Sequence, residues 1–100
     1  MSASPSEIPE AGTVVEMPGF RGTYLCILNG VAVIEAVLTG SVPAHAADGD
    51  EFVYVLSGTG VVRVGDQEHR LCAGDHLVIP KGTMHSVSCD GECRALLIGQ

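Results

Sequence analysis

The stretch Phe52 to Gly65 reads FVYVLSGTGVVRVG, two short apolar runs that glycines separate and close. Short runs rich in valine and aromatic residues and bounded by turn residues are typical of β-strands. The first run, Phe52 to Leu56, does not alternate with polar residues. It therefore predicts a strand that is covered on both faces.

Glycines divide the rest of the chain in the same way. They recur every seven to ten residues, at positions 12, 22, 30, 40, 49, 58, 65, 74, 82 and 91. Helices of ordinary length do not fit between such breaks, whereas short strands do, so the pattern predicts an all-β sandwich or barrel. One hundred residues are enough for a single domain. We expect this domain over residues 13–100, after a flexible N-terminal tail over residues 1–12.

The apolar segments between the glycines locate the expected strands. They lie at 13–17, 23–28, 31–38, 52–56, 61–64, 76–79, 84–87 and 94–98. Asn29-Gly30 and Asp90-Gly91 are pairs that tolerate positive φ at both positions, so each predicts a tight hairpin. The polar segment 66–70 is expected to be a connection that carries a solvated His69.

Composition excludes several classes of function. Twelve acidic residues against five basic ones give a net charge of −7, which argues against nucleic acid as a partner. No uninterrupted apolar run exceeds five residues, far below the roughly 20 that a membrane-spanning helix needs. The first residues carry no secretory signal pattern, so we expect a cytoplasmic protein. The four cysteines form no C-x-x-C pair and are expected to be reduced thiols.

Two windows in the middle of the chain carry the candidate chemistry. In the first, His45 is followed by Glu51 and then, after six intervening residues, by Gly58. In the second, Pro80-Lys81-Gly82 is followed by His85 after two intervening residues. These windows resemble the two motifs of the cupin superfamily, which have the same Glu-to-Gly and Pro-x-Gly-to-His spacings.

The resemblance spans about residues 40–89 and carries implications for fold and cofactor. It implies an antiparallel jelly-roll β-barrel, the double-stranded β-helix of cupins. It also implies that His45, Glu51 and His85 bind one divalent transition metal, Fe, Mn, Zn or Ni. The family pattern has a second His in the first motif, and this chain has Ala47 at that position, so one ligand is missing and the site is expected to bind metal more weakly.

The residues favour the same site without reference to the family. On a strand, Glu51, Val53 and Val55 share one face. A carboxylate beside two valines on an inner face is costly to bury unless another charge compensates it. Two imidazoles and a divalent cation would do so. Two His and one carboxylate are also the ligand set of non-haem Fe(II) oxygenases.

Two further sets of residues bear on ligands and partners. Cys89 stands where the cupin pattern has Asn, four residues after His85, and is a candidate pocket-lining residue; the alternative is a small buried hydrophobe. Phe52 and Tyr54 fall on the face opposite Glu51, where we expect them to pack in an interface. Because the chain is small, that interface predicts a homodimer.

Two functions from different classes follow. The first is a metal-dependent enzyme acting on a small oxygen-rich molecule, of the dioxygenase, isomerase, lyase or decarboxylase type, with no catalytic residue identified beyond the metal ligands. The second is a non-catalytic module that binds or senses a small molecule with weak or no metal, which Ala47 favours. A purely structural protein is a third reading without positive support.

Overall fold

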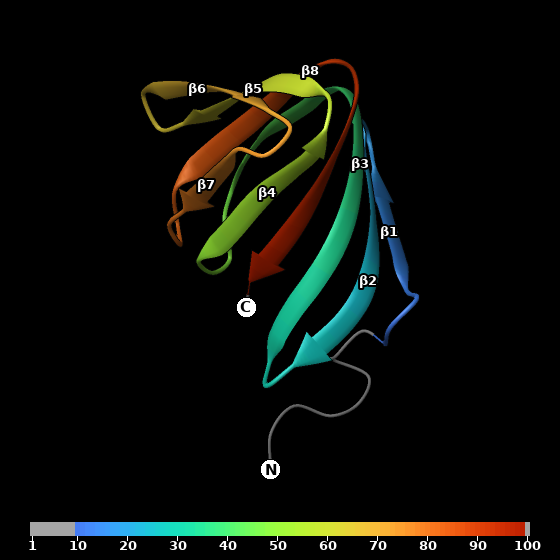
Figure 1. Cartoon of the computed structure of the whole chain (residues 1–100). Helices are drawn as coiled ribbons and strands as arrows, with labels where there is room; N and C mark the ends of the chain where they lie inside the picture. Colours follow the sequence, from blue (N-terminus) through green and yellow to red (C-terminus); the bar gives the residue numbers. More distant parts are fainter. Residues whose placement is uncertain (1–9, 100) are drawn as a thin grey trace.

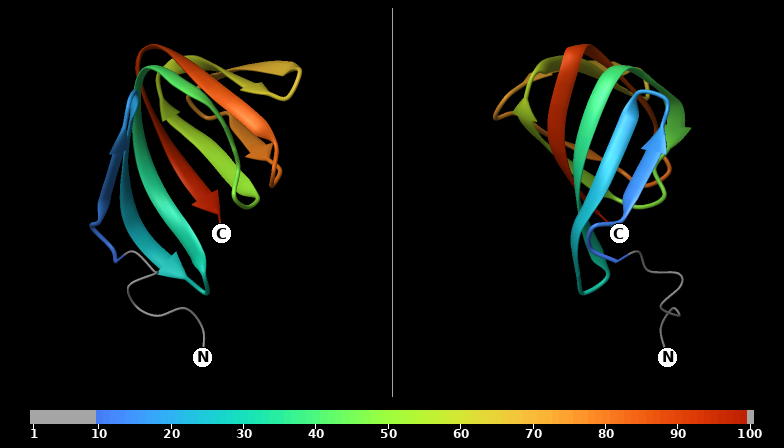
Figure 2. Two further views of the ribbon diagram at one scale, coloured as in Figure 1. Left: turned by 180° about the vertical axis from the view of Figure 1, so that it is seen from behind. Right: turned by 90° about the vertical axis from the view of Figure 1, so that its right-hand side faces the viewer.

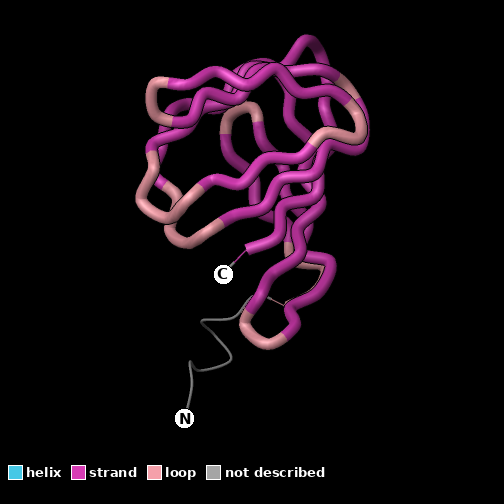
Figure 3. The backbone as a smooth tube through the Cα atoms, turned by 60° about the vertical axis from the view of Figure 1, so that its left-hand side comes forward, coloured by secondary structure: helices cyan, strands magenta, loops and turns pink. Residues whose placement is uncertain are grey.

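The computed structural model describes residues 10–99, and strands account for most of them (Figures 1 and 3). The strands in chain order are β1 (Val14–Met17), β2 (Phe20–Leu28), β3 (Val31–Ala46), β4 (Glu51–Ser57), β5 (Thr59–Val64), β6 (Gln67–Cys72), β7 (His76–Ile79) and β8 (Met84–Gly99). Within this described part there is no helix, and therefore none long and apolar enough to cross a membrane.

The expected N-terminal tail lies largely outside the described residues. Its last residues, 10–12, form a turn against β2, in which the Gly12 amide donates a hydrogen bond to the Tyr24 carbonyl at 2.7 Å. The first strand begins at Val14, one residue after the expected start of the domain.

All eight strands belong to one antiparallel sheet that folds over on itself (Figure 2). One layer follows the order β1-β2-β3-β8-β4-β7, while β5 pairs with the first half of β8 and with β6 to build the second layer. The 16-residue strands β3 and β8 pair with each other through both layers. The expected all-β, antiparallel jelly-roll fold is thus confirmed, although the sheet is open: over residues 10–99 no pairing joins its edge strands β1 and β7.

A bulge lets the two long strands pass from one layer to the other. On β8, residues 89–91 stand opposite the single residue Gly40 of β3, because Ser88 pairs with Ser41 and Glu92 with Thr39. Extra residues on one strand bend it and increase its twist. The strands expected to end at residues 38 and 87 therefore continue through the bend.

The two predicted hairpins have different outcomes. At Asn29-Gly30 both residues have positive φ, 55° and 78°, and the tight turn between β2 and β3 is confirmed. At Asp90-Gly91 the predicted hairpin is wrong, since only Gly91 has positive φ (81°) and the pair lies within β8. One left-handed residue suits a bulge, whereas this type of hairpin turn requires two.

Strand β6 replaces the connection expected over residues 66–70. It pairs residue by residue with β5, from Thr59 with Cys72 to Val64 with Gln67. Within β6 only Leu71 is buried, so the sequence carried almost no apolar alternation to reveal a strand.

The inward-facing residues of both layers form the core. The larger cluster joins residues of β3, β4, β7 and β8, namely Ala36, Leu38, Val42, Val53, Ile79, Cys93 and Ala95. A smaller cluster, Val55, Val62 and Leu71, lies under the β5–β6 hairpin. The two clusters therefore form the inner walls of a space that remains between the two layers of the sheet.

Gly58 provides a test of how closely the β4–β5 turn approaches the bend in β8. Its φ is +87°, and a Cβ there would lie 2.6 Å from the Glu92 carbonyl oxygen and 2.9 Å from Cys93 Cα. Gly65 also has positive φ (58°), but a Cβ there would meet nothing within 4 Å. In urea unfolding we expect Gly65→Ala to cost about 1 kcal/mol and Gly58→Ala about 3 kcal/mol, since only Gly58 adds overpacking to backbone strain. Equal costs would show that the close approach is wrong.

Candidate metal centre and ligand cavity

The two candidate histidines lie directly opposite each other on neighbouring strands. In the β3–β8 register His45 pairs with His85, so both side chains project from the same face. Their ring centroids are 4.2 Å apart and their planes are tilted by 59°. His85 is buried, with 6% of its surface exposed, and His45 is exposed near the end of β3. Strand pairing therefore brings together two imidazoles that are distant in the sequence.

Backbone carbonyls fix the tautomer of both rings. Nδ1 of His45 is 3.0 Å from the Pro43 carbonyl oxygen, and Nδ1 of His85 is 3.2 Å from the Thr83 carbonyl oxygen. A carbonyl oxygen only accepts hydrogen bonds, so each Nδ1 carries the proton and donates it. In the neutral form of each ring, Nε2 is then left with a lone pair, which is the arrangement typical of metal-binding histidines.

Glu51 is the first residue of β4 and lies on its inner face, in line with the buried Val53 and Val55. Burial raises the pKa of the Glu51 carboxyl above its usual value, while the positive charge that His85 and then His45 can carry partly offsets this by lowering the pKa. The carboxyl group is therefore close enough to interact with both imidazoles. It also lacks a permanent compensating charge.

The three candidate ligands line a cavity between the two layers of the sheet. Its volume is about 370 Å³, and most of its other lining residues are aliphatic. A second pocket of about 250 Å³ is lined by the same His45, Glu51 and His85, together with Asp48 and Asp50 of the β3–β4 connection. The three ligands thus stand at the junction between an apolar interior and a polar opening.

The donor set suits a divalent metal, although the side chains do not converge on one point. Among residues 10–99, no group of three or more His, Cys, Asp or Glu is arranged to hold an ion as the side chains stand. The chemistry of the donors fits such an ion, because two Nε2 lone pairs lie near a carboxylate that burial penalises. A metal ion at this site would therefore require the three side chains to adjust their positions.

Ala47, at the position of the missing histidine, serves the fold instead. Its side chain packs against the larger core cluster. Its amide donates to the Thr83 carbonyl at 3.3 Å, and its carbonyl accepts from the Gly82 amide at 2.8 Å. This residue therefore ties the end of β3 to the loop before His85, and offers no donor to a metal.

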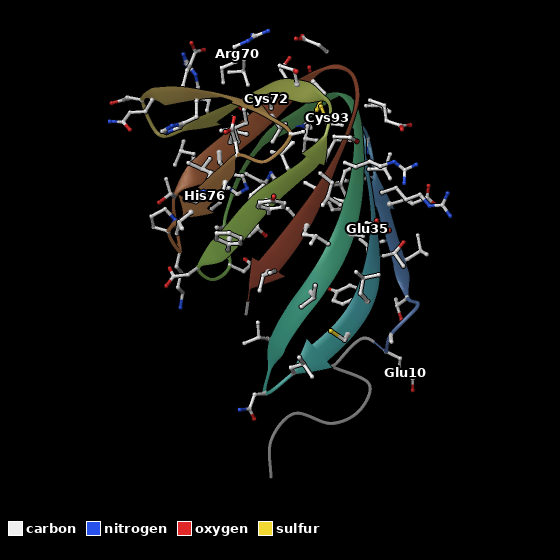
Figure 4. The ribbon with its side chains drawn as sticks, viewed as in Figure 1. Glu10, Glu35, Arg70, Cys72, His76 and Cys93 are labelled. Atoms are coloured by element: carbon white, nitrogen blue, oxygen red, sulfur yellow. The ribbon has the colours of Figure 1, made fainter. Side chains whose placement is uncertain are left out.

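The candidate pocket residue Cys89 lies in the lining of the larger cavity, together with Cys93. Burial, a hydrogen bond with Cys93 and the charges that Cys93 and Asp90 can carry raise the pKa of the Cys89 thiol to about 12. Cys93 Sγ donates to the Thr59 carbonyl at 3.2 Å, and Figure 4 places Cys93 beside the upper end of β4. Cys89 therefore forms part of the wall, because a thiol that keeps its proton is a poor nucleophile.

The remaining histidines lie outside the two pockets. His76, on β7 (Figure 4), stacks on Phe52 with ring centroids 5.8 Å apart, and His69 is half-buried on β6. Sequence reasoning missed Asp50, whose Oδ1 accepts a hydrogen bond from the Lys81 amide at 2.9 Å and so ties the two motif windows together. The only signal for this contact was that each residue lies inside one of the windows.

Comparison with known proteins identifies the family to which this fold belongs. A family model described as a cupin domain matches residues 33–99, which include all three candidate ligands. This chain belongs to the cupin domain family. No curated protein matches it.

Solved cupin structures share the fold. A cupin-2 domain protein from Shewanella frigidimarina is 26% identical over 93% of this chain and 84% of that one, with a TM-score of 0.72. KdgF from a Halomonas species is 19% identical over 87% and 84% of the two chains, with a TM-score of 0.73. FeII HppE is 14% identical, with a TM-score of 0.78; all of this chain aligns with 60% of the HppE chain. At these sequence identities, the structural similarity shows a shared fold and does not assign an activity.

The Glu51 carboxyl predicts how the stability of the metal-free protein depends on pH. A carboxyl whose pKa is raised on folding holds its proton more tightly in the folded state, so its contribution is complete at low pH and is lost as pH rises through the folded pKa. Glu51→Gln cannot ionise and should become progressively more stable than the wild type as the pH rises above about 4, where an unfolded glutamate ionises, until the pH passes the folded pKa of Glu51. Urea unfolding across this range, with the exposed Glu10→Gln as control, measures the difference. Parallel pH profiles of wild type and Glu51→Gln would contradict the buried position of this carboxyl.

Proposed function

We propose that this cupin is a metal-dependent enzyme acting on a small oxygen-rich molecule. The observation that carries the proposal is the cross-strand pair of His45 and His85. In each ring Nδ1–H donates a hydrogen bond to a backbone carbonyl, which leaves Nε2 available to bind a metal. Glu51 adds a carboxylate beside them. The reaction would be of the dioxygenase, isomerase, lyase or decarboxylase type.

The proposed cofactor is one divalent transition metal, Fe, Mn, Zn or Ni. Nε2 of His45, Nε2 of His85 and the Glu51 carboxylate would hold it. Two His and one carboxylate suit non-haem iron, and the cupin fold neighbour FeII HppE holds Fe(II). When bound, such an ion supplies Lewis acidity or, if it is iron, activation of oxygen.

The chain's own residues would prepare the site in three ways. The Pro43 and Thr83 carbonyls hold the imidazoles in one tautomer and orientation. The aliphatic walls exclude water, which strengthens electrostatic interactions at the polar end. The Glu51 carboxyl keeps a proton to higher pH than an exposed glutamate, so it is also the residue best suited to exchange a proton with a ligand when not bound to metal.

A second candidate function is non-catalytic binding or sensing of a small molecule with weak or no metal. Two observations favour it: Ala47 packs into the core where a ligand would stand, and the described chain holds no converged set of three donors. The cavity would then serve as the binding site alone. Because residues 10–99 contain four free cysteines, a reducing cytoplasmic setting suits either function.

Metal binding separates the two functions. We expect the wild type to bind one equivalent of Zn²⁺ or Co²⁺, and His85→Ala to bind at least tenfold more weakly, since it loses a donor of the cross-strand pair. His76→Ala is the matched control, because it removes a histidine that lines neither pocket. Isothermal titration calorimetry gives the affinities, and the Co²⁺ absorption spectrum reports ligand geometry. No binding at micromolar metal, or equal affinity of wild type and His85→Ala, would contradict the metal-dependent function.

The proposed partner, besides the small molecule, is a second copy of this chain. On the outer face of the sheet, Val33 pairs with Ile98, Ile98 with Phe52, and Phe52 with Val78, so a row of apolar side chains crosses four strands. Val78 is 55% exposed and the neighbouring Tyr54 is 38% exposed. An apolar row that continues across strands is typical of a surface that another protein covers.

Sedimentation velocity tests the homodimer. We expect a dimer for the wild type and a shift to monomer for Val78→Glu, because a charge at the β7 end of the row would be buried in the interface without a partner. Met84→Glu is the control, since Met84 is equally exposed (53%) but lies outside the row. A monomeric wild type, or a Val78→Glu variant that dimerises as well as Met84→Glu, would contradict this interface.

A further inference from the structure

The larger cavity is strongly asymmetric along its length. At one end stand His45, Glu51 and His85. The opposite end lies farther along the same strands: Val55 is four residues beyond Glu51 on β4, and Cys89 is four residues beyond His85 on β8. At roughly 3.3 Å per residue, four residues of strand separate the two ends by about 13 Å.

The end away from the histidines is apolar. Val55, Val62 and Leu71 form one packed cluster there, and all three line the cavity. Gly60 pairs with Leu71 on one side and with Cys89 on the other, so β5 connects β6 to β8 at this end. The thiol of Cys89, whose pKa is raised to about 12, carries no charge at neutral pH or well above it. A hydroxyl group placed here would lose its hydrogen bonds to water and find few replacements.

Charged side chains are confined to the other end and to the rim. Asp48 and Glu51 are the acidic residues of the lining. Arg94 is its one Arg or Lys within the described chain, and the Arg94 side chain is half exposed with Nε 3.6 Å from Glu92. Apart from the half-exposed Arg94, the described lining contains no Arg or Lys, so in the metal-free protein a carboxylate or phosphate inside the cavity would lose its hydration without gaining a strong partner.

From this asymmetry we infer that the cavity takes a small neutral molecule whose oxygen atoms are confined to one end, with a hydrocarbon body that reaches Val62 and Leu71. This inference rests on the proposed function and narrows its small oxygen-rich molecule to one that carries its oxygen atoms at one end, where they would face His45, Glu51 and His85. The volume, near the lower end of the roughly 300–1,000 Å³ of small-molecule sites, matches a short body. Sugars and sugar phosphates, which carry oxygen along their whole length, do not match the apolar end.

Three probes with the same six-carbon chain test the inference. Hexane-1,2-diol has two oxygens at one end, glucitol has one on every carbon, and 2-hydroxyhexanoate carries an anionic head. We expect hexane-1,2-diol to bind the metal-free protein at least tenfold more tightly than glucitol and more tightly than 2-hydroxyhexanoate, as followed by amide chemical shifts in ¹⁵N NMR spectra. Glucitol binding as well as the diol, or 2-hydroxyhexanoate binding more tightly than the diol, would overturn the inference.

A pair of near-isosteric variants locates the hydrocarbon body. Val62→Thr places a hydroxyl in the apolar end, and Val14→Thr makes the same change at an exposed position outside both pockets. The diol should bind Val62→Thr at least threefold more weakly than the wild type and bind Val14→Thr unchanged. If Val62→Thr does not fold, the chemical shift changes in the wild type decide: they should include Val62 and Leu71, and their restriction to the polar end would overturn the inference.

Loading the protein with Zn²⁺ and repeating the titrations separates this inference from the proposed metal function. Selective binding of the diol by a protein that takes up no metal would support the inference while the enzyme proposal fails. Tight metal binding together with a preference for glucitol would support the metal-dependent function and overturn the inference about the ligand.

Discussion

The antiparallel pairing of β3 with β8 is the interaction on which the rest of this cupin depends. It runs through both layers of the sheet and carries them past the bend at Gly40. Near its end it sets His45 opposite His85, so the position of the imidazole pair follows from backbone hydrogen bonding. Since a register shift of one residue would turn one histidine to the other face, the site and the fold depend on the same register.

A buried carboxyl beside two imidazoles makes this site electrostatically incomplete without a ligand. Burial disfavours the charged form of Glu51, and neither ring carries a permanent charge to offset it. A divalent cation would satisfy this group and both Nε2 lone pairs together. The aliphatic walls around it matter equally, because they decide which molecules can reach the polar end. The proposed metal affinity and the inferred polarity of the ligand would therefore both follow from one uneven cavity.

The sequence was informative wherever local chemistry decides the outcome. Glycine spacing indicated an all-β fold, and Asn29-Gly30 indicated a hairpin. Glu51, Val53 and Val55, which occupy every second position of one strand, indicated its inner face. It misled where distant contacts decide: Asp90-Gly91 forms a bulge because β3 continues beside β8. The carbonyl partners of the two histidines were likewise beyond prediction, because ring orientation depends on the finished strand pair.

The most direct test of the site is the tautomer of His45 and His85 in the metal-free protein. Long-range ¹H–¹⁵N NMR spectra at about pH 8, where an unperturbed imidazole is neutral, distinguish a protonated ring nitrogen from one with a free lone pair. The hydrogen bonds to Pro43 and Thr83 predict that both rings carry the proton on Nδ1, with Nε2 unprotonated. Spectra in which both rings are protonated on Nε2 would contradict a pair of imidazoles prepared to bind metal.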